Sequence, residues 1–391
     1  MKCIFNLLTS LFLCLFFLQI NEIQAQSNLR VSILTCGVGE ELYSSYGHSA
    51  IRVVDSASNQ DVVYNYGTFN FGDPDFYSKF TRGKLLYYVN DEQFNNFMSQ
   101  YVEEGRSVYE QTLQLSQADA LAINSFLINN LKEENKYYKY DFLFDNCSTR
   151  IRDLFINIFK DRIHFNQIIS NDSVSFRTFL NYYERNVHWE RFGINLLMSN
   201  LVDQKMTSFQ SMFLPDYLMK GFDIATLDGK KIVEKNVLIL PATSFVVEKM
   251  NQPLIVFWLL FVSIVLLSFL PKMNTALKYF DIFFFMILGL LGFFMLFMWF
   301  GTEHKVCAWN RNILWAFPLH LFFAFMIPRA DTNKLSQYAK YATWLIVGSM
   351  FYSIVAQQKY IQEITPLIFL ILFRLNKYRM SKLKFLTNFR R

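Results

Sequence analysis

Residues 279–300, YFDIFFFMILGLLGFFMLFMWF, carry Asp281 as their one charge. An apolar run of about 17 to 25 residues is long enough to cross a bilayer as a helix. The same criterion predicts further spans at 253–270, 312–328 and 341–357, and a weaker one at 360–375, whose strongly apolar part is 364–375. Residues 251–375 are therefore predicted to form a bundle of about five transmembrane helices.

The placement of lysine and arginine favours five spans over four. With the N-terminal region outside, Lys272, Lys278 and the loop at 329–340 lie on the cytoplasmic side. The end of the chain, 374–391, contains seven Lys and Arg and no acid. Cytoplasmic segments are enriched in these cations, so the fifth span must cross and the tail, 376–391, must lie inside.

The composition implies that one part of the chain faces water and another part faces lipid. It is 52% hydrophobic and 18% aromatic, which is too apolar for a soluble protein, yet charged residues fill the stretch from about 30 to 249 at the density of a globular domain. Without the seven cations of the tail, thirty-one Lys and Arg face thirty-two acids. We therefore expect no nucleic-acid partner, and the basic tail indicates contact with lipid headgroups.

The first residues have the pattern of an export signal. Lys2 precedes a largely apolar run at 4–20 and a polar exit that ends at Ala25. Residues 1–25 are predicted to be a signal peptide cleaved after Ala25, with an uncleaved anchor helix as the alternative. Either outcome places residues 26–250 on the outer side of the inner membrane, in the periplasm.

The exported region shows an α+β pattern. Strands are predicted at 30–35, 49–54, 62–66 and 85–89, where apolar and polar residues alternate or β-branched residues gather. Helices are predicted at 118–132, capped by Ser116, and at 145–159, 173–183 and 208–220. We expect a small antiparallel sheet with helices packed on it.

Two short segments of this region carry reactive side chains. In residues 46–53, YGHSAIRV, His48 follows a glycine at the start of a strand. In residues 140–150, YDFLFDNCSTR, Cys147 lies in the first turn of a helix. The free N–H groups and positive dipole end of a helix N-terminus lower the pKa of a thiol, and a nearby imidazole would complete an activated nucleophile.

Composition alone permits a plainer interpretation. Free cysteines are among the most buried residues, and a single histidine on a strand is usually structural. In an oxidising compartment Cys36 and Cys147 could also form a disulfide in a non-catalytic scaffold.

A set of longer motifs resembles a known family. The order of histidine on a strand and then cysteine at a helix start is similar to the circularly permuted papain-like branch that includes NlpC/P60 peptidases. More narrowly, the chain resembles the bacterial lipoprotein N-acyltransferase family, with Val38 where a proline is expected after Cys-Gly. The matching segments are 34–37 LTCG, 46–50 YGHSA, 64–69 YNYGTF, 145–150 DNCSTR and, in the membrane half, 310–315 NRNILW.

The resemblance assigns roles in the exported domain. It implies that Cys147 is the nucleophile and His48 its base, and that a polar group on the next strand, Asn65 or, less favourably, Tyr64, orients the imidazole. The Cys147 backbone N–H would stabilise the oxyanion.

Supporting roles are expected at three further places. Asn146 is a candidate support for the oxyanion site, and Cys36 is expected to pack near the site or support it. On the outer loop at 301–311 and just beyond it, His304, Asn310, Asn312 and Trp315 are candidate contacts for a lipid substrate, although tryptophan at an interface is ordinarily an anchor.

The function that the resemblance implies is a transacylation needing no metal or cofactor. An acyl chain would pass from a phospholipid to Cys147 and then to the α-amine of a diacylglyceryl-cysteine lipoprotein, with both lipid substrates held by the bilayer. The alternative is a cell-wall peptidase or amidase of the NlpC/P60 kind, anchored by the same helices. No zinc-binding spacing of cysteine and histidine is present.

Overall fold

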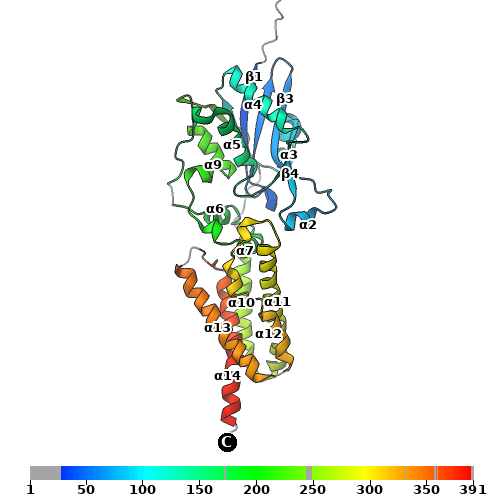
Figure 1. The fold of residues 1–391 in the computed structure, drawn as a ribbon, viewed down its shortest axis with the longest axis vertical. Coiled ribbons are helices and arrows are strands. Elements are labelled where there is room, and N and C mark those ends of the chain that lie inside the picture. Colours follow the sequence, from blue (N-terminus) through cyan, green and yellow to red (C-terminus); the bar gives the residue numbers. More distant parts are fainter. Residues whose placement is uncertain are drawn as a thin grey trace, which may run out of the picture.

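The computed structural model describes residues 28–170, 173–243, 249–329, 331–355, 358 and 360–388. The predicted signal peptide, 1–25, lies outside these ranges. An α+β domain is stacked end to end on a helical bundle, so that the molecule is elongated (Figure 1).

A seven-stranded antiparallel sheet organises the described part of the N-terminal domain, in the order β10-β5-β1-β2-β3-β4-β6. The four predicted strands correspond to β1–β4, and the sheet is larger than predicted. Two of the three strands missed by sequence are edge strands, which are buried on fewer sides and alternate weakly. The bounds are β1 Leu29–Cys36, β2 His48–Asp55, β3 Gln60–Thr68, β4 Leu86–Gln93, β5 Val108–Leu113, β6 Tyr137–Lys139 and β10 Val233–Leu240.

The third missed strand, β5, is an inner strand with buried polar residues. Its Glu110 accepts two hydrogen bonds from Arg52 on β2, and its Gln111 donates to Asp223. A buried polar group is tolerated when it is hydrogen-bonded. These internal partners break the apolar alternation that would have identified the strand.

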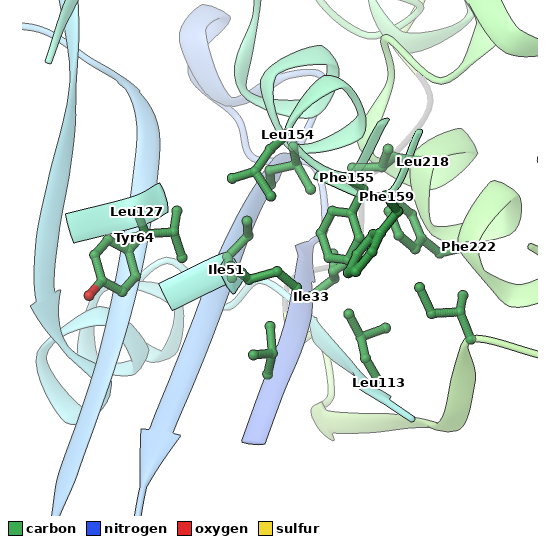
Figure 2. Close-up of a cluster of buried hydrophobic side chains, with 14 of the residues drawn as sticks. Ile33, Ile51, Tyr64, Leu113, Leu127, Leu154, Phe155, Phe159, Leu218 and Phe222 are labelled. Atoms are coloured by element: carbon green, nitrogen blue, oxygen red, sulfur yellow. The ribbon is translucent and has the colours of Figure 1, made fainter. Parts of the chain in front are cut away.

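Helices cover both faces of the sheet. Helices α4 (Gln117–Asn130), α5 (Cys147–Phe159) and α9 (Pro215–Ile224) pack on one face, where aromatic and aliphatic side chains form the main core (Figure 2). Helix α3 (Phe94–Glu103) covers the other face, and its Phe97 and Tyr101 contact a smaller buried cluster. The main core fixes α5, and with it Cys147, against the sheet.

Helix boundaries follow local chemistry. The Ser116 side chain accepts from the Asp119 N–H and starts α4, as predicted. The single helix predicted at 208–220 is wrong, because Pro215 starts a new helix there. The remaining short elements of this domain are α2 Phe76–Thr81, α6 Phe176–Tyr183, α7 His188–Leu197, α8 Ser208–Ser211, and a small sheet of β7 Ile163–His164, β8 Thr226–Leu227 and β9 Lys230–Lys231.

Five helices form the C-terminal bundle within the described residues: α10 Gln252–Leu267, α11 Asn274–Phe300, α12 His320–Met326, α13 Thr332–Val355 and α14 Ile364–Asn388. Of these residues, Pro271–Phe300 form a helix long and apolar enough to cross a membrane, and α10 is a shorter apolar helix. The segment predicted as the third span, 312–328, is not one continuous helix. It comprises part of a 3-10 turn, an irregular stretch and the short α12.

Close packing of α11 against this irregular segment depends on two glycines. A Cβ added at Gly289 would lie 2.2 Å from the Leu321 nitrogen, and one at Gly292 would lie 2.1 Å from the Ala316 oxygen. Small residues let helix backbones approach in a bilayer. These glycines therefore place the irregular segment against α11.

A buried ion pair joins α14 to α11. Arg374, which the charge pattern assigned to the basic tail, is almost fully buried and donates to Asp281 over 2.6 and 2.8 Å. Tyr378 and Ser268 accompany the pair, with the Tyr378 hydroxyl donating to Asp281 and Arg374 donating to Ser268. An ion pair with satisfied hydrogen bonds lets the weakly apolar fifth helix remain in the bundle.

Removing one partner of this ion pair should destabilise the bundle. We expect Arg374→Met to lower the free energy of unfolding by about 3 to 5 kcal/mol, because it leaves the Asp281 carboxylate buried without its guanidinium. The double variant Asp281→Leu with Arg374→Met should recover at least half of that loss. Thermal unfolding of purified protein in detergent measures both, and equal losses in the two variants would contradict the assignment.

Candidate active site

The start of α5 is built so that Cys147 occupies its first turn. Asn146 accepts from the Thr149 N–H at 2.9 Å, and its own N–H donates to the Thr149 hydroxyl at 2.8 Å. Its side-chain amide also donates to the carbonyls of Phe142 and Phe213, both at 2.8 Å. Since both amide hydrogens are used, the structure places Asn146 as a support for the helix start.

His48 is presented by a sharp turn before β2. Gly47 has a φ of 81°, and an added Cβ would lie 2.5 Å from the Cys36 carbonyl oxygen. A left-handed conformation this close to another backbone favours glycine. The turn places the imidazole at the first residue of β2, opposite Cys36 on β1.

A chain of hydrogen bonds orients the imidazole. The Asn65 amide donates to Glu92 at 2.8 Å, so its oxygen is the atom that accepts from His48 Nε2–H, at 3.1 Å. His48 also hydrogen-bonds with Cys147. Because Nε2 is engaged with Asn65, Nδ1 is the ring nitrogen left for the thiol.

The two reactive groups shift each other's pKa. Burial raises the pKa of the Cys147 thiol, but the His48 charge and hydrogen bond and the Ser49 N–H outweigh it, and the pKa lies below its ordinary value. Burial lowers the pKa of His48, but the charge and hydrogen bond of Cys147 outweigh it, and that pKa is raised. Both shifts favour the thiolate–imidazolium pair over the neutral thiol and imidazole.

The surroundings of the sulfur suit acyl chemistry. The hydroxyls of Ser49 and Ser148 are 3.0 Å apart and tie the start of β2 to α5. In the first turn of a helix the N–H groups have no intrahelical acceptor. The Thr149 N–H is bonded to the Asn146 side chain, so the Cys147 and Ser148 N–H groups are the candidate donors to an oxyanion at Cys147.

Two other predicted residues lie near the site and have other partners. Cys36 is a buried free thiol whose pKa burial raises to about 12, and it hydrogen-bonds with Tyr101. Cys147 is also a free thiol, so the disulfide considered from the sequence is not formed. Tyr64 packs in the main core, on the opposite face of β3 from Asn65 (Figure 2).

Comparison with protein families identifies both halves of the chain. Residues 17–181 match the Lnb N-terminal periplasmic domain, and residues 246–384 match the Lnb transmembrane domain, which is described as having five helices. The chain belongs to the Lnb family. No curated protein and no solved structure matches it.

The Lnb assignment settles the topology. The chain is a multi-pass inner-membrane protein, with its N-terminal domain in the periplasm and five transmembrane helices after it. The prediction of an exported α+β domain followed by a membrane bundle is confirmed at this level.

A buried polar network joins the Lnb transmembrane domain to α7, a helix that lies between the two matched ranges. Asn310 and Asn312 donate to the Leu196 carbonyl of α7 at 2.6 and 3.1 Å, and Trp315 Nε1–H donates to Asn312 at 3.0 Å. Gln358, which leads toward α14, donates to the Asn310 oxygen at 3.2 Å. The structure thus places these three predicted lipid contacts inside the joint, where their polar atoms hold the periplasmic domain in position.

A second contact lies on the outer loop of the Lnb transmembrane domain. His304 Nε2–H donates to the Phe80 carbonyl of α2 at 3.0 Å, and the Glu303 N–H donates to the Arg82 carbonyl at 2.9 Å. Lys139 donates to the Glu303 carboxylate at 2.5 Å. The loop therefore packs against α2 and the residues just after it.

The structure gives partners to three residues to which the motifs assigned no role. Glu92 on β4 is the diagonal cross-strand neighbour of Asn65 and fixes its amide. Tyr46 donates at 2.5 Å to the buried Glu184, whose pKa burial raises to about 7. The strand register, which the sequence does not state, was needed to pair Glu92 with Asn65.

Other candidate sites carry less chemistry. A cavity of about 510 Å³ is lined by residues of α6, α7 and 360–363. On its wall Arg177 pairs with Asp203 and Arg191 pairs with Glu363, so these charges neutralise each other. Within the ranges that the structure describes, no three His, Cys, Asp or Glu side chains are grouped so that they could hold a metal ion.

The pH dependence of Cys147 alkylation should reveal the ion pair between Cys147 and His48. Iodoacetamide should modify Cys147 with a pH midpoint below the ordinary thiol value, and His48→Ala should move that midpoint up by about 1 to 3 pH units, because burial then acts without the opposing charge. The rate at each pH is read by mass spectrometry of the Cys147 peptide.

Cys36 and Cys307 provide internal controls for this experiment. Burial raises the pKa of both thiols to about 12, so they should stay unlabelled below pH 9. An unchanged Cys147 midpoint in His48→Ala would contradict the pair.

Proposed function

We propose that this protein is a lipoprotein N-acyltransferase whose periplasmic domain has a permuted papain-like fold, with Cys147 as nucleophile, His48 as acid and base, and Asn65 as orienting residue. One observation carries the proposal. The thiol, imidazole and amide lie in a chain of hydrogen bonds at a helix start, in a domain joined firmly to a membrane bundle.

In the first step the Cys147 thiolate attacks an ester carbonyl of a phospholipid. The sulfur–carbon bond forms, the ester carbon–oxygen bond breaks, and the His48 imidazolium gives its proton to the departing alkoxide. The products are a lysophospholipid and a thioester on Cys147. N–H groups at the start of α5 would stabilise the negative charge that develops on the carbonyl oxygen.

In the second step the uncharged α-amine of a diacylglyceryl-cysteine lipoprotein attacks the thioester. The nitrogen–carbon bond forms, the carbon–sulfur bond breaks, and neutral His48 takes the proton of the amine. Cys147 leaves as a thiolate, so the original ion pair is restored. The amide product is more stable than the thioester, which drives the transfer forward.

The arrangement of the two domains supports a lipid substrate. Buried hydrogen bonds to α7, and an exposed one from the loop at 301–311 to α2, hold the periplasmic domain on the outer end of the bundle. Both proposed substrates are bilayer lipids, and a site held at the membrane can receive them without releasing their chains into water. A soluble muropeptide would not need a site that is held at the membrane.

Expression in cells that lack their own lipoprotein N-acylation tests the proposal. The N-terminal peptide of a lipoprotein should gain one acyl mass with this protein present. Cys147→Ser should abolish the gain, and His48→Ala should slow it by about 10² to 10⁴-fold, the usual contribution of general acid–base catalysis. Mass spectrometry of the peptide is the measurement.

Cys307→Ala is the matched control, because it removes a different free thiol and should keep the acyl gain. An unmodified N-terminus from well-expressed protein would overturn the transferase proposal. Release of muropeptides by the same protein would then favour the peptidase alternative.

A further inference from the structure

An exposed aromatic surface surrounds α2. Phe71 is 66% exposed, Tyr77 is 80% exposed and Phe80 is 51% exposed. Large apolar side chains gathered on a soluble surface usually mark an interaction site. The exposed cations Arg82 and Lys84 follow directly, and aromatic rings beside cations are typical of a surface that enters lipid headgroups.

Helix α2 lies at the level of the periplasmic surface of the inner membrane. Figure 1 shows it at the end of the periplasmic domain that faces the bundle. Its contacts reach the loop at 301–311, which directly follows the transmembrane helix α11. Trp309 and Phe300 on this side of the bundle are 70% and 73% exposed, and Trp299 lies 4.7 Å from each ring, as in the aromatic belt at a membrane interface.

A row of aromatic rings runs from this surface to the sulfur. Phe71 lies 4.7 Å from Phe69, Phe69 lies 5.2 Å from Tyr87, and Tyr87 stacks on Tyr140 at 4.4 Å, measured between ring centroids. A Cβ added at Gly67 would lie 3.6 Å from the Tyr140 ring and 3.8 Å from Cys147 Cβ, so both flank the same glycine. The row is therefore continuous from an exposed end to the reactive thiol.

We propose that the aromatic surface at Phe71, Tyr77 and Phe80 enters the outer leaflet, and that the acyl chain of a bilayer phospholipid follows the row from Phe69 to Tyr140 so that its ester reaches Cys147. This inference rests on the proposed function for the identity of the ester. Apolar contact along the row offsets the cost of drawing a chain out of the bilayer. The occupant of the surface is the outer leaflet itself.

Photocrosslinking tests membrane entry. The full chain is reconstituted in vesicles of phosphatidylethanolamine and phosphatidylglycerol whose acyl chains end in an alkyne, with p-benzoylphenylalanine replacing Tyr77. Leu121, an apolar residue of α4 that is 50% exposed, provides the control position because α4 lies at the end of the domain remote from the bundle (Figure 1). We expect lipid adducts at position 77 to exceed those at position 121 by about tenfold, and equal yields would overturn membrane entry.

The path is tested by the triple variant Phe71→Ser, Tyr77→Ser and Phe80→Ser. Acylation of Cys147 from vesicle phospholipid should fall at least about tenfold, since each lost apolar contact is worth one or more tenfold steps. Acylation by a water-soluble butyrate ester and alkylation by iodoacetamide should be unchanged. A parallel loss with the soluble ester, or no loss with vesicles, would overturn the path.

The outcomes separate this inference from the proposed function. If protein with p-benzoylphenylalanine at position 77 crosslinks lipid but wild-type protein transfers no acyl chain, membrane entry is supported and the transferase proposal is overturned. If acyl transfer proceeds while position 77 yields no more lipid adduct than position 121, the transferase proposal is supported and membrane entry of the aromatic surface is overturned.

Discussion

The charge pair between Cys147 and His48 is the interaction on which the site depends. Burial alone would raise the pKa of the thiol and lower that of the imidazole, and both groups would then be neutral. Their mutual attraction, with the hydrogen bonds from Ser49 and Asn65, reverses both shifts. Several local features maintain this geometry, including the Asn146 cap, the Gly47 turn and the Glu92 contact that fixes Asn65.

The joint between the domains gives this pair a fixed place above the membrane. Domains linked by small polar contacts usually move relative to one another. Here Asn310 and Asn312 are buried and hydrogen-bonded to α7, and Arg191 of α7 pairs with Glu363 before α14. Such a joint resists rotation, because turning the domain would leave these buried groups without partners.

Local patterns in the sequence were sufficient for the elements that surround the thiol and the imidazole. Alternation predicted β1 to β4, and the cap at Ser116 predicted the start of α4. Strand β5 was missed because Glu110 and Gln111 find partners inside the protein. Pro215 divided a helix that hydrophobic periodicity alone had predicted as continuous.

Charge and motif spacing were less reliable where a partner lies far along the chain. Arg374 resembled a tail residue because its neighbours are basic, yet it pairs with Asp281, 93 residues away. Asn310, Asn312 and Trp315 were placed near a lipid substrate because they lie at the end of an outer loop and the start of a predicted membrane span. Their hydrogen bonds with α7 and with one another could not be inferred, because the local sequence does not show which distant helix the segment contacts.

The sequence by itself determined that this protein meets both water and lipid, that its exported half is α+β, and that a histidine begins a strand while a cysteine begins a helix. The spacing of hydrophobic residues, the placement of charges and the capping residues determine these properties. Each of these patterns acts over a few neighbouring positions. Only the tertiary structure decided that Asn65 rather than Tyr64 meets the imidazole, that Cys36 stays a separate buried thiol, and that aromatic rings from three segments form one row. Each of these depends on strand register and on which faces pack together, and such contacts join residues that the chain keeps far apart.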